Sequence, residues 1–192
     1  ALIVCAFARP TYQTEGGWGG GAHPVTVHVL VDQSYSTRYQ LPSGSLFAQL
    51  QDQLLSLLNV LPPHDRVTIQ PFAAHSQPLL EGERARLTER VAELDPGQDA
   101  TDLRAALYTA AQYLDQSPHP NRELFLFTDL SHHNWNQLQL GDLSRLFSDT
   151  RIYITAPQVP QRPNAYIKAV KIPSWMLSAH DKATVQADIA YD

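Results

Sequence analysis

The sequence predicts an α/β fold with a doubly wound, mostly parallel sheet flanked by helices, and three observations support this. Apolar segments of strand length alternate along the chain with longer segments whose apolar residues recur at helical spacing. The strand-like segments are apolar on both faces, as strands buried between two helical layers should be. Hydrophobic residues make up 43% of the 192 residues and charged residues only 17%, which suits a globular core.

Four segments are predicted to be strands of the sheet. The first reads VTVHVLV and is almost entirely β-branched or apolar. The strands are expected at 25–31, 67–72, 124–128 and 152–155. A short segment at 77–80 is expected to be an edge strand. Strands that alternate with helices in this way form a parallel sheet with both faces covered.

The helices follow from the spacing of apolar residues and from the residues that end each pattern. They are expected at 46–61, 87–94, 103–114 and 138–147. Pro62 and Pro63 end the first, and Pro96 with Gly97 closes the second. Thr101 is a plausible N-cap of the third, since threonine hydroxyls accept hydrogen bonds from helix-start amides.

Composition divides the chain into three parts, 1–23, 24–158 and 159–192. The first part opens with eight apolar residues, too few to cross a bilayer, which takes about 20. This run is either a buried strand or the end of a membrane helix, and a glycine-rich linker at 16–21 follows it. The last part begins with a proline-rich linker and is expected to be the start of a β-rich module, because apolar residues alternate over 185–191.

Side chains with oxygen atoms gather where predicted strands end. The first strand runs into Asp32, Ser34 and Ser36, Thr101 precedes a helix, and Asp129 follows a later strand. Because ligands of open α/β sheets bind at the carboxyl ends of the strands, we expect these five side chains to lie together.

Such a set of oxygens is suited to a hard divalent cation. Mg²⁺ takes six oxygen ligands, keeps some waters and is held by one or two carboxylates. Asp32 and Asp129 would offset the charge of the ion, and the hydroxyls of Ser34, Ser36 and Thr101 would add neutral oxygens. A position left open would suit an incoming carboxylate, so the pattern favours an adhesion-type site over a catalytic one.

The Asp32-x-Ser34-x-Ser36 motif, Thr101 and Thr128-Asp129 resemble the metal-ion-dependent adhesion site of von Willebrand factor type A domains, over about residues 24–158. The resemblance implies Mg²⁺, or Mn²⁺, with Ser34 and Ser36 as direct ligands. Thr101 and Asp129 would bind directly or through water, and Asp32 would often act through water and orient the serines. It also implies a protein-binding function, adhesion or scaffolding, through an Asp or Glu carboxylate of a partner, and no enzymatic activity.

This sequence departs from the family pattern at two positions. Many relatives have glycine where this chain has Leu130, and a small residue where it has Tyr35. Tyr35 is expected at the rim of the site, where it could narrow the site or contact a partner.

The flanking segments are similar to those of bacterial membrane-anchored proteins of the Bat (aerotolerance-associated) type. This similarity implies a membrane helix upstream of residue 9 and a domain on the periplasmic side of the bacterial inner membrane. Partners of such proteins include MoxR-type AAA+ ATPases and other envelope subunits. A nucleic-acid partner is not expected, because the net charge is −5.

Other interpretations of the same residues remain open. Asp32 and its serines could simply cap a turn. A Mg²⁺-dependent phosphohydrolase also places an aspartate after its first strand, but it normally needs a nearby lysine, and the first lysine here is Lys168. A metal-free structural domain of the same family is a third possibility.

Three histidines and one tryptophan lie outside the proposed ligand set, and their roles are predicted separately. Adjacent His132 and His133 invite a zinc site but have no third ligand nearby, so solvated loop histidines are expected. His28 lies inside a predicted buried strand and should be hydrogen-bonded rather than functional. Trp135 is expected to contact a partner, the alternative being that it anchors its own loop.

Overall fold

The computed structural model describes residues 24–74, 77–130, 135, 140–157, 165–171 and 185–191. The chain divides into two compact units, one ending at Pro157 and one beginning at Gln158. The apolar start at 1–8, the glycine-rich linker and His132 with His133 lie outside the described residues. The extents assigned to three domains from the sequence stay predictions.

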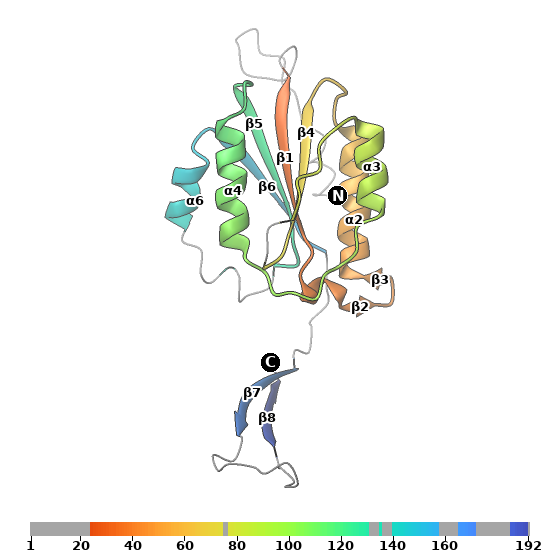
Figure 1. Ribbon diagram of the computed structural model, residues 1–192, viewed down its shortest axis with the longest axis vertical. Helices are drawn as coiled ribbons and strands as arrows, with labels where there is room; N and C mark the ends of the chain where they lie inside the picture. Colours follow the sequence, from red (N-terminus) through yellow and green to blue (C-terminus); the bar gives the residue numbers. More distant parts are fainter. Residues whose placement is uncertain are drawn as a thin grey trace. The chain divides into compact units, whose positions relative to one another are not determined.

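The first unit contains a four-stranded parallel sheet in the order β4-β1-β5-β6 (Figure 1). Its strands are β1 (Val25–Asp32), β4 (Arg66–Phe72), β5 (Asn121–Phe127) and β6 (Thr150–Thr155). The chain leaves β1 for β4 on one side and later returns to β5 on the other. The carboxyl end of β1 is therefore the switch point at which ligands bind in doubly wound sheets. The predicted fold class is confirmed.

Helices cover both faces of this sheet, as Figure 1 shows. Helices α2 (Leu46–Val60) and α3 (Arg84–Ala92) lie on one face, and α4 (Leu103–Asp115) and α6 (Leu140–Leu146) on the other. Alternate residues of β1 point to opposite faces of the sheet: Val27 and Val29 pack with α2 and α3, whereas Leu30 packs with α4. This double burial explains why the first strand is almost entirely β-branched or apolar.

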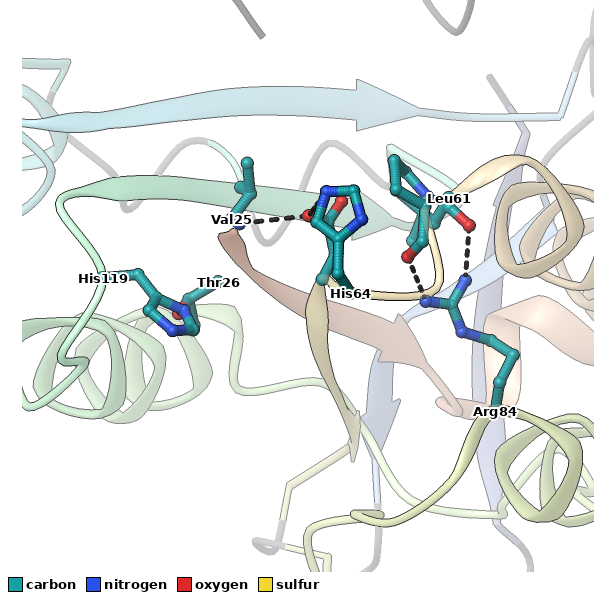
Figure 2. A network of polar contacts seen from close by, with 8 residues as sticks. Val25, Thr26, Leu61, His64, Arg84 and His119 are labelled. Atoms are coloured by element: carbon teal, nitrogen blue, oxygen red, sulfur yellow. Dashed lines mark hydrogen bonds and ion pairs between the residues drawn. The ribbon is translucent and has the colours of Figure 1, made fainter. Parts of the chain in front are cut away.

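Polar groups at both ends of α2 satisfy its terminal backbone atoms. Ser45 is the N-cap, and its hydroxyl accepts a hydrogen bond of 3.0 Å from the amide of Ala48. At the other end the guanidinium of Arg84 donates to the carbonyls of Leu58 (2.7 Å) and Pro62 (2.9 Å). It also donates to the carbonyl of Leu61 (3.0 Å; Figure 2). A cation at a helix C-terminus also complements the helix dipole.

The structure differs from the predicted elements at several boundaries. Helix α3 ends at Ala92, so Pro96 and Gly97 lie in the following loop rather than at its end. The expected edge strand at 77–80 is reduced to one bridge, between Leu80 and Ile69. The sequence patterns also gave no sign of the 3₁₀ helix η1 (Tyr35–Arg38) or of the small hairpin formed by β2 (Gln40–Leu41) and β3 (Gly44–Ser45).

The second unit contains an antiparallel pair of strands, β7 (Ala165–Lys171) and β8 (Gln186–Tyr191). These strands agree with the β-rich segment expected after the proline-rich linker. Ile167 lies opposite Ile189, and both side chains are exposed. Within the described residues, no helix has both the length and the apolar character needed to cross a membrane.

His28 is fully buried on β1 and is hydrogen-bonded, as its position in the strand predicts. Its Nδ1 lies 2.8 Å from the Thr68 hydroxyl and its Nε2 3.1 Å from Oε1 of Gln70. The ring of Tyr113 from α4 covers it, with centroids 4.9 Å apart. Burial lowers the pKa of His28 from 6.5 to about 4. The imidazole is therefore neutral in the folded protein at neutral pH.

This buried histidine should make stability depend on pH. Between about pH 6.5 and pH 4 the unfolded chain binds a proton at His28 that the folded chain does not, so stability falls as the pH falls. From pH 7.5 to pH 5 the contribution of this one group is about 2 kcal/mol. Denaturant unfolding of the wild type and of His28→Gln at both pH values measures it. The variant should lose about that much less stability on acidification; equal losses in the two proteins would contradict the assignment.

Candidate metal centre

The candidate site lies at the carboxyl edge of the sheet, where β1 and β5 end side by side. Asp32 is the last residue of β1, and Thr128 and Asp129 directly follow β5. Thr101 approaches the same edge from the loop before α4. Three stretches far apart in the sequence thus meet at the switch point of the sheet.

The carboxylate of Asp32 is the centre of this arrangement. Its Oδ1 accepts hydrogen bonds from the amide of Ser34 (2.9 Å) and the hydroxyl of Thr101 (3.4 Å). Its Oδ2 accepts a hydrogen bond of 3.0 Å from the hydroxyl of Thr128. The bond to Ser34 is the local turn contact that the capping interpretation expects. The bonds to Thr101 and Thr128 are long-range, so a local turn does not account for the whole arrangement.

The electrostatics of Asp32 favour a nearby cation. The residue is completely buried. Burial raises the pKa of its carboxyl, and the negative charge of Asp129 raises it further, while hydrogen bonds from Ser34 and Thr128 oppose the rise. Two close carboxylates disfavour each other's charged form, and a buried charge is normally paired or coordinates a metal. Positive charge at this edge would relieve both the burial cost and the repulsion.

The two serines place their hydroxyls together beside Asp32. Ser34 Oγ and Ser36 Oγ lie 3.0 Å apart and share a hydrogen bond. Ser34 is buried and stands at the N-cap position of η1, but its side chain makes no capping hydrogen bond. Capping therefore does not explain the Ser34 hydroxyl, whereas a hydroxyl pair beside a carboxylate fits the oxygen ligands of a hard cation.

The expectation that Thr101 caps the following helix is wrong. Helix α4 begins at Leu103, and its N-cap is Asp102, whose carboxylate accepts a hydrogen bond of 2.9 Å from the amide of Ala105. Asp102 therefore does the capping that was expected of its neighbour. The Thr101 hydroxyl instead donates its hydrogen bond to Asp32, as a residue of the candidate site would.

Of the five predicted ligand residues, hydrogen bonds connect Asp32 to Ser34 and Thr101, and connect Ser34 to Ser36. Asp129 is buried, only 6% exposed, and is linked to the group through its electrostatic effect on Asp32. Among the described residues there is no cluster of three or more His, Cys, Asp or Glu side chains placed to hold a metal. A cation here would thus depend on hydroxyl oxygens as well as on the two carboxylates.

Sequence reasoning missed the contacts that hold the serine loop in place. The side-chain amide of Gln33 donates to the carbonyl of Asp95 (2.9 Å), and the amide of Gly97 donates to the carbonyl of Gln33 (2.6 Å). The amide of Tyr35 donates to the carbonyl of Asp99 (2.9 Å). These bonds attach the loop after β1 to the segment that leads into Thr101. In the sequence, Pro96-Gly97 indicates only a helix end.

Thr128 is a second residue whose role was not assigned from the sequence. In the sequence it is only the neighbour of Asp129, whereas in the structure its hydroxyl donates a hydrogen bond to Asp32 Oδ2. Trp135 packs against the core cluster of α4 and β5, which supports the anchoring interpretation over partner contact.

The parallel sheet and the loops at its switch point define an α/β domain of the doubly wound class. The sequence profile of the von Willebrand factor type A domain matches residues 27–132, more than half of the chain. The chain therefore belongs to the von Willebrand factor type A family. No curated protein sequence matches it.

Solved structures with a similar fold include two Bat-type proteins. An aerotolerance-related membrane protein from Bacteroides fragilis has a TM-score of 0.54 and 18% identity, covering 85% of this chain and 81% of that one. BatB from Bacteroides thetaiotaomicron has a TM-score of 0.56 and 13% identity, covering 85% and 80%. A von Willebrand factor type A protein from Catenulispora acidiphila has a TM-score of 0.52 and 18% identity, covering 71% and 33%. At these identities the similarity concerns the fold.

Proposed function

We propose that this domain binds a protein partner at the carboxyl edge of its sheet, through a divalent cation and a carboxylate of the partner. The cation, Mg²⁺ or Mn²⁺, would be held by Asp32, Ser34, Ser36, Thr101 and Asp129. The observation that carries the proposal is the buried Asp32 carboxylate, which receives hydrogen bonds from three separate stretches of chain and is repelled by Asp129.

The donor set fits a hard cation because all its atoms are carboxylate or hydroxyl oxygens. When bound, Mg²⁺ supplies an electrophilic position that a carboxylate oxygen can fill. The hydroxyls of Ser34 and Ser36 would be the direct ligands, and Asp32 would orient Ser34 through its amide. Thr101 and Asp129 would bind directly or through water. The bonds from Thr101 and Thr128 hold the Asp32 carboxylate in one orientation.

A binding module is favoured over the phosphohydrolase alternative by the residues around Asp32. Position 34 is a serine rather than a second carboxylate, and no lysine precedes Lys168. Phosphoryl transfer depends on cationic groups that stabilise the transferred phosphoryl oxygens. We therefore propose a non-enzymatic, adhesion or scaffold function.

We further propose that the domain belongs to a bacterial envelope protein anchored through a membrane helix upstream of residue 9. The similarity of fold to an aerotolerance-related membrane protein supports this placement. The domain would then lie on the periplasmic side of the inner membrane. Other envelope subunits or a MoxR-type AAA+ ATPase would be its partners.

Isothermal titration of Mg²⁺ into the purified chain tests the metal-dependent function. We expect one site per chain in the wild type and no measurable binding in Ser34→Ala, because the variant loses a ligand oxygen but no charge. Ser56→Ala, which removes an exposed hydroxyl on α2, is the matched control and should bind as the wild type does. Equal binding by Ser34→Ala would contradict the site. Turnover of phosphomonoesters that is lost in Ser34→Ala would favour the phosphohydrolase.

A further inference from the structure

Tyr35 stands beside the candidate metal centre with its ring in solvent. It lies between Ser34 and Ser36, and its side chain is 66% exposed, the highest value among the exposed large hydrophobic side chains described. Its backbone is nonetheless fixed, because its amide donates to the carbonyl of Asp99. The chain thus fixes the backbone of an aromatic residue between two proposed ligands and leaves most of its side chain exposed to solvent.

Leu130 is a second apolar side chain next to a proposed ligand. It directly follows Asp129, is 46% exposed, and has a φ of 55°. This left-handed conformation is unfavourable for leucine and is adopted far more readily by glycine. Its amide donates to the Thr128 hydroxyl at 3.4 Å. About half of the leucine side chain is exposed despite this backbone conformation, and strained residues of this kind cluster at functional sites.

Both apolar residues therefore border oxygens that would hold a cation. The two buried carboxylates, Asp32 and Asp129, would offset the charge of a divalent cation, and its open coordination position would take one oxygen atom of a partner, for which a carboxylate is a suitable hard ligand. A carboxylate alone offers little selectivity, because every acidic surface residue carries one. Binding hot spots are enriched in tyrosine and lie where side chains are fully removed from water, so an exposed ring beside the open position can supply that selectivity.

We infer that Tyr35 and Leu130 form an apolar rim that selects partners in which the metal-binding Asp or Glu is followed by a large apolar side chain. This inference rests on the proposed function of the site and adds the chemistry of the partner segment. The carboxylate completes the coordination of the cation. The neighbouring apolar side chain is removed from water against the ring of Tyr35 and the side chain of Leu130.

Two blocked hexapeptides test this directly: both are glycine-rich with one central aspartate, and they differ only in having phenylalanine or glycine after it. Their affinities are measured by NMR titration of the isotopically labelled chain in the presence of Mg²⁺. The wild type should bind the phenylalanine peptide about tenfold more tightly, the gain expected from burying one apolar side chain. The preference should fall below about threefold in Tyr35→Ala and in Leu130→Gly.

Leu130→Gly removes the side chain and also relieves the left-handed backbone, so it should fold at least as well as the wild type. Val60→Ala, which removes an exposed valine at the far end of α2, should keep the full preference. Equal affinity for the two peptides, no binding of either, or an unchanged preference in both rim variants would overturn the inference. Calorimetry with Mg²⁺ alone separates this from failure of the proposed function, since both rim variants should bind the ion as the wild type does.

Discussion

Replacing Asp32 with asparagine is expected to abolish the stabilisation of the chain by Mg²⁺ while leaving the metal-free protein at least as stable. A ligand that binds only the folded state at 100 times its Kd raises the free energy of unfolding by about 2.7 kcal/mol. For a chain of this size the melting temperature should then rise by on the order of 5–10 °C. Without Asp32 the site has one carboxylate left, Asp129, and this rise should vanish.

The metal-free Asp32→Asn protein is expected to be at least as stable as the wild type because residue 32 is buried. Asparagine keeps an oxygen that can accept from the Ser34 amide, and it removes a buried charge that Asp129 repels. Thermal unfolding followed by circular dichroism, in EDTA and in millimolar Mg²⁺, measures both effects. Asp52→Asn, on the exposed surface of α2, is the control and should behave as the wild type. An Asp32→Asn protein that is still stabilised by Mg²⁺ would show that the cation binds elsewhere.

The second large effect is expected from Gly97→Ala, a change at a residue that is not itself a proposed ligand. A Cβ at this position would lie 2.8 Å from the carbonyl oxygen of Gln33, which no side chain tolerates without a shift. The same carbonyl accepts the amide of Gly97 at 2.6 Å, so the two backbones cannot simply separate. We expect a loss of stability on the order of 1–3 kcal/mol, as overpacking usually gives.

The new Cβ at residue 97 should push the backbone of Gln33 away. Because Gln33 lies between Asp32 and Ser34, this movement should also displace the serine hydroxyls and weaken Mg²⁺ binding on the order of tenfold. Gly141→Ala is the matched control: a Cβ there meets no atom within 4 Å, and the residue lies in α6. That variant should keep its affinity and be as stable as the wild type or slightly more so. If Gly97→Ala binds Mg²⁺ and melts as the wild type does, the contact between Gly97 and the Gln33 carbonyl does not position the loop after β1.

Much of the fold could be predicted because the informative patterns are local. The nearly continuous run of apolar and β-branched residues in β1 and the leucine spacing of α2 each identify an element without knowledge of its neighbours. The order of these elements, with the β1 switch point, then places Asp32, Thr101 and Asp129 at one edge of the sheet. The candidate site followed from topology rather than from any single motif.

The details of the site could not be predicted because they depend on contacts between distant residues. Thr101 and Asp102 are both good cap residues, and only the long-range bond from Thr101 to Asp32 distinguishes their roles. Gln33 and Asp95 are 62 residues apart in the sequence, and no local pattern indicates their hydrogen bond. The bridge between Leu80 and Ile69 likewise depends on tertiary pairing. The composition of 77–80 favours an extended segment but does not indicate that only one of its residues pairs with β4.

The most direct measurement is anomalous diffraction from crystals of the chain grown with Mn²⁺, recorded near the manganese absorption edge. The account predicts one strong anomalous peak at the carboxyl ends of β1 and β5, about 2.1 Å from the hydroxyl oxygens of Ser34 and Ser36. A map with no peak at this edge, or with its strongest peak at some other surface of the domain, would contradict the account.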